Sequence, residues 1–348
     1  MHRQMETLIS SLQPQITFPV LHASDVAAAR RAGQKLADSL GFAEVQTGRL
    51  AIVITEAGTN ILKHAGEGTL YIMRAQSGVD TPGIDVVAVD NGPGIRDLET
   101  SLRDGVSTAG TAGTGLGALR RQADEFDVWT ARDRGAVFFM RVWSSPAPPE
   151  PCGIEVGALC VPLAGEDDSG DGWAVSCNRY GASLLGVDGL GHGPEAHKAA
   201  AGAIAALERR PGATPSETLH VAHDALRVTR GAALSVARID YAANELRFAG
   251  IGNVNGVVYD GDTRRALVSH NGIVGNNMRK VQEFGVACPP GALVILHSDG
   301  IQTQWDLKAY PGLAARTPAI VAGILMRDFI RRRDDAMVLV GRRRGGHA

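Results

Sequence analysis

The chain has 348 residues, enough for about two domains at roughly 150 residues each. Hydrophobic residues make up 44% and charged residues 21%, a composition that excludes a largely disordered chain. The formal net charge of −2 and the aromatic content of 5% favour neither nucleic-acid binding nor an acidic interaction tail. We therefore expect a globular protein that does not bind nucleic acid.

The sequence carries no signal for export or membrane insertion. No apolar run reaches the roughly 18 residues of a membrane span. The first residues, MHRQMETLISSLQPQ, lack the apolar centre of a secretory signal. The cysteines fit no zinc-site spacing and are expected to be free thiols: Cys152, Cys160, Cys177 and Cys288. These features predict a cytoplasmic protein without a membrane partner.

Residues 1–143 predict a mixed α/β domain. Ser24 is suited to cap a helix over Asp25–Leu40, which Gly41 would end. Apolar residues at helical spacing predict a second helix over Arg49–Ala65, and a third is expected over Leu116–Asp124. Short apolar segments predict strands at Ile16–Leu21, Leu70–Ala75, Ile84–Val89, Asp127–Thr130 and Val137–Trp143.

Residues 144–151 read SSPAPPEP and predict a linker. Proline locks φ and lacks the N–H that a helix or sheet needs, so such a run favours an extended spacer. The flanking parts do not resemble each other, and each is long enough to build its own core. We therefore expect separate domains at about 1–143 and 152–348.

Residues 152–348 contain more strand signals than helix signals. Helices are expected over Glu195–Arg209, Ser216–Arg227 and Pro318–Arg331, outside packed sheets. The basic runs Arg331–Arg333 and Arg342–Arg344 are interpreted as solvated surface. The predicted strands are Ile154–Val161, Trp173–Asn178, Ser183–Val187, Ala233–Ile239, Glu245–Ala249, Val254–Tyr259, Ala292–His297 and Ala336–Val340.

Polar residues in the first part gather at a helix face and at a strand end. Glu56, Asn60 and His64 are spaced four apart and therefore share one face of the second helix. Asp90 follows the strand Ile84–Val89, and the turn after it, Asn91-Gly92-Pro93-Gly94, would direct its carboxylate into a cleft. A solvated helix face and an ordinary turn also fit these residues when each is taken alone.

A glycine-rich segment, Gly113-Thr114-Gly115-Leu116-Gly117, opens the third helix. Glycine lets backbone amides approach an anion, and a helix N-terminus favours negative charge. A tight turn explains this segment equally well by itself. The order of the three features, however, favours a nucleotide site.

The strings ITEAGTNILKHA, VDNGPGI and GTGLGALRRQADEF resemble the N, G1 and G2 boxes of the GHKL ATPases, over about residues 16–143. Within that group they are most similar to the small anti-sigma-factor switch kinases of the RsbT type. The resemblance implies a two-layer α/β sandwich of the Bergerat type that binds ATP with Mg²⁺.

The same resemblance implies a role for each matching residue. Glu56 would orient or deprotonate the attacking serine hydroxyl, and Asn60 would hold the magnesium ion against the phosphates. Asp90 would accept a hydrogen bond from the adenine amine. A charged helix face explains Lys63 and His64 equally well. The remaining cofactor contacts would come from Gly92, Gly94, Gly113, Thr114, Gly115 and Gly117.

Aspartates recur at chain turns in the second part. Carboxylates gathered at one sheet edge repel each other unless cations lie between them. Hard oxygen ligands select magnesium or manganese, and two such ions can activate a water for phosphoester hydrolysis. Any single Asp-Gly is also an ordinary turn. The segments are Ser169-Gly170-Asp171-Gly172, Asp188-Gly189-Leu190-Gly191-His192-Gly193, Ser298-Asp299-Gly300 and Arg333-Asp334-Asp335.

The strings DGLGHG, SDG and RDDAMVLV resemble motifs of the PPM metal-dependent serine/threonine phosphatases, over about residues 152–342. The SpoIIE branch, which includes the RsbX-like phosphatases, fits best. The resemblance implies an α/β/β/α sandwich with two Mn²⁺ or Mg²⁺ ions. Its implied metal ligands are Asp171 and Asp188, the Gly189 carbonyl, Asp299 and Asp334.

Three nearby residues leave alternatives open. Asp335 could substitute for its neighbour Asp334 as a ligand. Met337 stands where the family has Thr or Ser, which places a supporting hydrogen bond in question. His192 is explained equally well by a place beside the metal ligands and by loop packing.

Together the resemblances imply a partner-switching regulator with serine kinase and phosphoserine phosphatase activities. Its substrates would be STAS-domain anti-sigma antagonists or stressosome scaffold proteins, through which it would control a sigma factor or stress signalling. In one alternative the first domain only binds nucleotide or a partner protein; Glu56 argues against it, because a pure binder needs no such carboxylate. In another, both domains are scaffolds, which the complete aspartate set disfavours.

Overall fold

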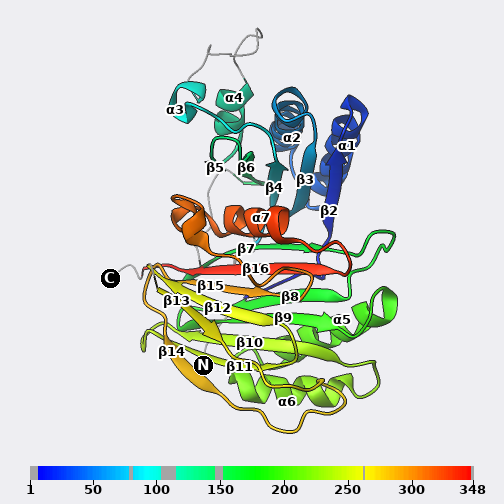
Figure 1. The fold of residues 1–348 in the computed structure, drawn as a ribbon. Coiled ribbons are helices and arrows are strands. Elements are labelled where there is room, and N and C mark those ends of the chain that lie inside the picture. Colours follow the sequence, from blue (N-terminus) through cyan, green and yellow to red (C-terminus); the bar gives the residue numbers. More distant parts are fainter. Residues whose placement is uncertain (1–6, 78–80, 103–114, 146–151, 262, 346–348) are drawn as a thin grey trace.

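The computed structural model describes residues 7–77, 81–102, 115–145, 152–261 and 263–345 (Figure 1). Its layers stack along the long axis in the order helices, sheet, helix α7, sheet, sheet, helices. The expected mixed α/β architecture of both parts is confirmed. In the described residues no helix is long and apolar enough to cross a membrane.

The first part is a five-stranded antiparallel sheet with helices on one face. Helices α1 (Ala23–Ser39), α2 (Glu44–His64) and α4 (Gly115–Gln122) cover it, and α3 (Leu98–Ser101) is a short addition. α2 begins before the predicted Arg49 because its first turn carries no apolar periodicity. In sheet order the strands are β2 (Gln15–Val20), β3 (Gly68–Arg74), β4 (Gly83–Asp90), β6 (Ala136–Trp143) and β5 (Glu125–Thr130).

The second part stacks two further sheets face to face. Helices α5 (Pro194–Arg209) and α6 (Pro215–Leu226) cover the outer face of the six-stranded sheet. That sheet contains, in order, β1 (Thr7–Ser10), β8 (Asp171–Cys177), β9 (Gly181–Gly189), β10 (Ala232–Asp240), β11 (Glu245–Ile251) and β14 (Phe284–Ala287). The second, five-stranded sheet contains, in order, β13 (Thr263–Leu267), β12 (Asn255–Asp260), β15 (Leu293–His297), β16 (Ala336–Arg343) and β7 (Ile154–Val161).

Helix α7 (Pro318–Phe329) is a layer shared by both parts. It packs on β7 and β16 with one side and on β4 and β6 with the other. Every residue over 318–326 is buried, as expected for a helix that is apolar all round. One apolar core therefore joins the two parts, in addition to a core within the first part and two within the second.

Hydrogen bonds also join the two parts around α7 and β7. Asp127 of β5 accepts hydrogen bonds from the Thr317 amide, at the N-terminus of α7, and from the Arg316 guanidinium, at 2.8 and 3.1 Å. Gln76 pairs with the main chain of Ala158, donating at 2.8 Å and accepting at 2.6 Å. Because β7 is an edge strand, such side-chain pairing satisfies main-chain groups that no neighbouring strand reaches.

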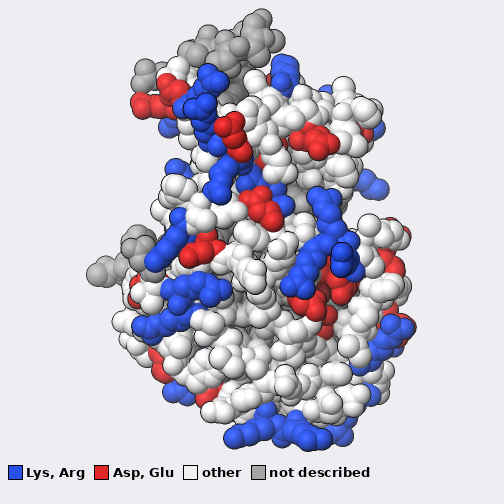
Figure 2. Space-filling view, in the orientation of Figure 1, with Lys and Arg blue, Asp and Glu red and all other residues white. Residues whose placement is uncertain are grey.

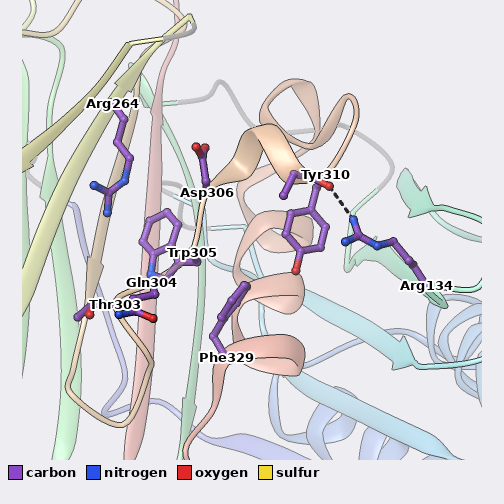
Figure 3. Close-up of a pocket in the computed structure, with 9 residues that line it drawn as sticks. Arg134, Arg264, Thr303, Gln304, Trp305, Asp306, Tyr310 and Phe329 are labelled. Atoms are coloured by element: carbon purple, nitrogen blue, oxygen red, sulfur yellow. Dashed lines mark hydrogen bonds between the residues drawn. The ribbon is translucent and has the colours of Figure 1, made fainter.

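A hollow of about 570 Å³ opens at the same junction (Figure 3). Both of its arginines already lie against aromatic rings: Arg134 is 4.9 Å from the ring centre of Tyr310, and Arg264 is 5.3 Å from that of Trp305. Arg134 also donates to the Ala309 carbonyl at 2.6 Å. The hollow contains none of the predicted site residues, and we interpret it as part of the packing between the two parts.

Two expectations are corrected by the structure. The segment Thr7–Ser10, counted with the first domain, pairs antiparallel with β8 in the second part. The prediction that all cysteines are free thiols is wrong, since Cys152 and Cys177 form a disulfide with Cα atoms 6.4 Å apart. Their separation of 25 residues carries no pairing signal in the sequence. The predicted linker residues 146–151 lie outside the described residues.

Candidate functional sites

The predicted catalytic and magnesium-binding side chains lie on α2. Glu56 and Asn60 are one helical turn apart and half-buried on the face beside α4. The Asn60 side-chain nitrogen is buried and has no hydrogen-bond partner among the described residues. An orphaned buried N–H donor costs free energy unless an acceptor satisfies it, so this nitrogen fits a contact with a phosphate oxygen, whereas a cation would need the side-chain oxygen of the same amide.

Asp90 ends β4 and is fixed by backbone amides. Its Oδ1 accepts from Gly92 at 2.8 Å and from Ala136 at 3.2 Å. Burial raises the pKa of Asp90, while these hydrogen bonds and the charges of Arg327 and His64 act in the opposite direction. The second carboxylate oxygen accepts no bond from the described residues, so it can receive a donor such as an adenine amine.

Local structure explains why glycine occupies the positions after Asp90. A Cβ on Gly92 would lie 2.8 Å from the Ala65 side chain at the end of α2. Gly94 adopts φ of +72°, a conformation that favours glycine. Gly115 and Gly117 form the first turn of α4, as predicted. Gly113 and Thr114 lie outside the described residues.

A contact from the second part reaches this site. Arg327 of α7 donates to the main-chain carbonyl of Asp90 at 3.0 Å. Its guanidinium is also held by Asp328, at 2.6 and 2.9 Å, and its side chain is only 5% exposed. The residue that is predicted to bind adenine is therefore in direct contact with the helix shared by the two parts.

Asp171 and Asp188 face each other across neighbouring strands. Asp171 begins β8, Asp188 lies near the end of β9, and the two are paired in register. Like charges placed directly opposite in an antiparallel pair destabilise a sheet. The strand register therefore forces together the two carboxylates that were predicted to bridge the metals.

The other predicted ligands lie close enough to act on this pair. Burial raises the pKa of Asp188 to about 7, with further contributions from the charges of Asp299 and Asp334. Burial and the charge of Asp188 likewise raise the pKa of Asp171 well above its usual range. The Asp171 Oδ2 is buried without a hydrogen-bond partner among the described residues. Asp171 is also among the residues that line a cavity of about 300 Å³.

This donor set fits a hard divalent cation, because it consists of carboxylate oxygens of which one is orphaned. In the described residues, however, no group of three or more His, Cys, Asp or Glu side chains converges in a geometry that would hold a metal ion. The assignment of individual ligands therefore remains a prediction.

The two neighbouring aspartates differ in their surroundings. Asp335 is buried and accepts hydrogen bonds from the amides of Leu163 and Gly170, at 2.7 and 2.8 Å. Asp334 is exposed, and its Oδ1 accepts from the Asp335 amide at 2.9 Å. Because the Asp335 carboxylate is already occupied by main-chain donors, Asp334 is the better candidate for a ligand.

Two residues of the site were not singled out from the sequence. Asn253 donates to Asp299 at 2.6 Å and lies close enough to Asp188 to lower the pKa of that carboxyl. Ser298 accepts from the Met337 amide at 3.0 Å and lies close enough to Asp171 to lower the pKa of that carboxyl. Ser298 thus supplies the polar support for the carboxylates that the sequence left in question at Met337; its place in the SDG string was the available signal.

The loop after Asp188 is also held in place. Gly189 donates its amide to the Gly170 carbonyl at 2.9 Å. His192 pairs through Nδ1 with Glu166 at 2.7 Å. Asp171, Asp188, Asp299, Asp334 and Asp335 are called the carboxylate cluster below. The pairing with Glu166 gives His192 a defined position at the rim of this cluster.

Comparison with known proteins identifies both parts. Residues 18–142 match the family model of the histidine kinase-like ATPase domain, and residues 180–344 match that of Stage II sporulation protein E. The serine/threonine-protein kinase RsbT of Bacillus subtilis (strain 168) is 38% identical over 112 residues, which are 32% of this chain and 83% of that protein.

Two solved structures are similar to about half of this chain. A protein from work on "The bacterial stressosome: a modular system that has been adapted to control secondary messenger signaling" has 29% identity and a TM-score of 0.52, covering 54% of this chain and 99% of that one. RsbX in complex with magnesium has 19% identity and a TM-score of 0.49, covering 54% and 94%. The chain therefore belongs to the RsbT family of histidine kinase-like ATPase domains in its first part, and it carries a SpoIIE domain in its second.

Proposed function

We propose that this chain is a partner-switching regulator that phosphorylates serine with one site and removes phosphate from phosphoserine with the other. Its substrates would be STAS-domain proteins, either anti-sigma antagonists or stressosome scaffolds. The family of each part supports this pairing of activities. The observation that carries the phosphatase half is the register that places Asp171 opposite Asp188.

In the kinase half, each residue has a task that its position allows. Asp90 would accept a hydrogen bond from the adenine amine at its free oxygen. Asn60 would bind the Mg²⁺ that accompanies the ATP phosphates through its side-chain oxygen, and its unpartnered nitrogen would donate to a phosphate oxygen. Glu56, one turn before Asn60, would accept the proton of the serine hydroxyl as that oxygen attacks the γ-phosphorus. The two glycines that open α4 would face the phosphates.

In the phosphatase half, Asp171, Asp188, Asp299, Asp334 and the Gly189 carbonyl would hold two Mn²⁺ or Mg²⁺ ions. When bound, these ions would polarise the phosphoester and lower the pKa of a water. Ser298 would orient Asp171, and Asn253 would hold Asp188 and Asp299 in their relative positions.

A second candidate function also has a structural basis. The hydrogen bond from Arg327 to the Asp90 carbonyl joins the predicted nucleotide site to α7. In this alternative the first part is a nucleotide sensor that tunes the phosphatase and phosphorylates nothing. ATP would then change the dephosphorylation rate, while no phosphate would pass to a protein.

The test is incubation of the full chain with labelled ATP and a purified STAS-domain protein, with Mg²⁺ alone and with added Mn²⁺. We expect label on the STAS-domain protein and its release as phosphate in the manganese arm. Excess chelator should stop both reactions. A chain that releases phosphate from phosphoserine protein but never labels it would support the sensor alternative. Phosphate release that survives chelation would overturn the metal assignment.

A further inference from the structure

Three consecutive arginines occupy the turn between α7 and β16. Arg331, Arg332 and Arg333 are exposed and immediately precede Asp334. Within the described residues none of the three guanidinium groups forms a hydrogen bond or an ion pair. From the sequence they were interpreted as solvated surface, but the fold places them beside the carboxylate cluster.

The backbone fixes this turn against the loop that carries Asp299. The Arg331 amide donates to the Gly300 carbonyl at 2.8 Å, and Gln302 donates to Phe329 at 2.9 Å. An antiparallel bridge between Ile301 and Ile330 lies between these two bonds. The arginines are therefore presented from a main chain that is anchored next to a predicted metal ligand.

Arg332 has φ of +56°, the left-handed conformation that residues other than glycine seldom adopt. Such a residue persists only where its surroundings determine the backbone. Here the constraints are the bridge before the turn and the start of β16 after it. The backbone of the turn is thus fixed beside the cluster, while the charge of Arg332 also acts on Tyr71 of β3.

A further arginine reaches the same cluster from another element. Arg230, between α6 and β10, lies close to Gly191 of the Asp188 loop: a Cβ on Gly191 would be 3.0 Å from its guanidinium nitrogen. Figure 2 shows basic side chains gathered above acidic ones over the turn between α7 and β16. The carboxylates therefore have a basic rim.

This rim has a clear electrostatic consequence. Even with two divalent cations bound, the five aspartates of the cluster keep a net negative charge, so the centre alone attracts a phosphorylated acidic segment poorly. Unpaired arginines at the rim bind carboxylates and phosphate in a planar, two-pronged geometry. A substrate that is acidic next to its phosphoserine would bind more tightly, because its phosphate would reach the metal centre while its carboxylates contact the arginines.

We propose that the arginine turn Arg331–Arg333 docks acidic side chains that flank the phosphoserine of the substrate protein. The proposal rests on the phosphatase half of the proposed function and adds the class of sequence that it selects. Since Arg333 is adjacent to Asp334, the contacts would reach substrate residues within about three positions of the phosphoserine, at roughly 3.5 Å of extended chain per residue.

The test uses the full chain with Mn²⁺ and two phosphoserine peptides that differ only in having acidic or neutral flanking residues. The measured quantity is the ratio of kcat/KM for the acidic peptide to kcat/KM for the neutral one. Each exposed arginine–carboxylate contact contributes about twofold, so the wild-type ratio should be about tenfold at low salt and should fall as salt is added. Because the ratio is taken within one preparation, it does not depend on the fraction of folded enzyme.

The variants are the triple change R331Q/R332Q/R333Q, the triple Arg→Lys change at the same positions, and Arg209→Gln as a matched control. Arg209 is exposed at the far end of the 16-residue α5, about 24 Å from the end that follows the Asp188 loop. The glutamine variant should have a ratio near one, the lysine variant an intermediate ratio, and the Arg209 variant the wild-type ratio. The single changes Arg332→Gln and Arg333→Gln should each lower the ratio about twofold, which provides a measurement if the triple variant does not fold.

A wild-type ratio near one, or a ratio that the glutamine changes leave intact, would overturn the docking proposal while the phosphatase assignment stands. Loss of the preference in the Arg209 variant would also overturn it, because a general charge effect would then explain the data. If wild-type protein hydrolyses neither peptide with Mn²⁺, the proposed phosphatase function fails, and the docking proposal fails with it.

Discussion

Separating the chain at residues 146–151 should leave neither piece able to fold alone. Separation would expose the shared face of α7 on one piece and the matching sheet face on the other. The large side chains of the first sheet that lie in this core are Tyr71, Met73, Val87, Val89, Trp129, Val137 and Phe139.

The loss of folding free energy on separation follows from the burial of these side chains. Full burial of one large apolar side chain is worth about 1.5–3 kcal/mol. If about half of the burial of these seven depends on α7, each piece loses about 5–10 kcal/mol, which is comparable to the whole stability of a domain of roughly 5–15 kcal/mol. The second piece, residues 152–348, would in addition lose β1 from the edge of its six-stranded sheet.

The assay compares three samples: the full chain, residues 1–145 and 152–348 expressed separately, and the full chain cut at a protease site placed within 146–151. The separate pieces should aggregate or bind a dye for exposed apolar surface, and the full chain should unfold in a single transition. The cut chain should remain one particle in gel filtration, because the core holds the halves together. Two soluble pieces that each unfold cooperatively would refute the shared core.

Three further predictions concern single residues. Asp90→Asn should weaken ATP binding about tenfold or more in calorimetry, because a charge-assisted hydrogen bond to adenine is lost; equal affinity would contradict the adenine role. Asp188→Asn should raise the free energy of unfolding in chelator at pH 8 by about 2–4 kcal/mol, and by less as the pH falls toward 4. The sign follows because the raised pKa of Asp188, about 7, makes its ionisation destabilising, so the stability present at low pH is lost as the pH rises through that value; urea unfolding at several pH values checks this, and a destabilised variant at pH 8 would contradict it. Gly323→Val should destabilise the chain by about 1–3 kcal/mol, because a Cβ there would lie 2.8 Å from the Val137 side chain; unchanged urea unfolding would show that the contact is loose.

Local patterns predicted most of the elements. Helical spacing in α2 and apolar runs such as β4 and β16 give strong signals, and the motifs placed Asp171 and Asp188 in one site before their strand register was known. β1 escaped prediction because TLIS is short and half polar, and its partner β8 lies more than a hundred residues away. β13 is mostly exposed and carries two arginines, so it shows no alternation of apolar residues.

What sequence could not predict depends on contacts between distant segments. The shared core was not foreseen, although α7 carries a signal for it. Apolar residues lie on all sides of this helix, and a single sheet can cover only one side. The arginine turn looked like solvated surface because its position beside the carboxylates depends on the bridge between Ile301 and Ile330. Asn253 lies in a short loop after β11, and only the fold brings it to Asp299.

The central claim is that one chain both adds phosphate to a STAS-domain protein and removes it, at two separate sites. The most direct measurement is the phosphate content of that substrate, by intact mass, after incubation with wild type, Glu56→Ala or Asp188→Asn in the presence of ATP, Mg²⁺ and Mn²⁺. Asp188→Asn should accumulate phosphorylated substrate. Glu56→Ala should leave unmodified substrate untouched and should strip phosphate from substrate that was phosphorylated beforehand. Phosphorylation by the Glu56 variant, or no accumulation with the Asp188 variant, would contradict the account.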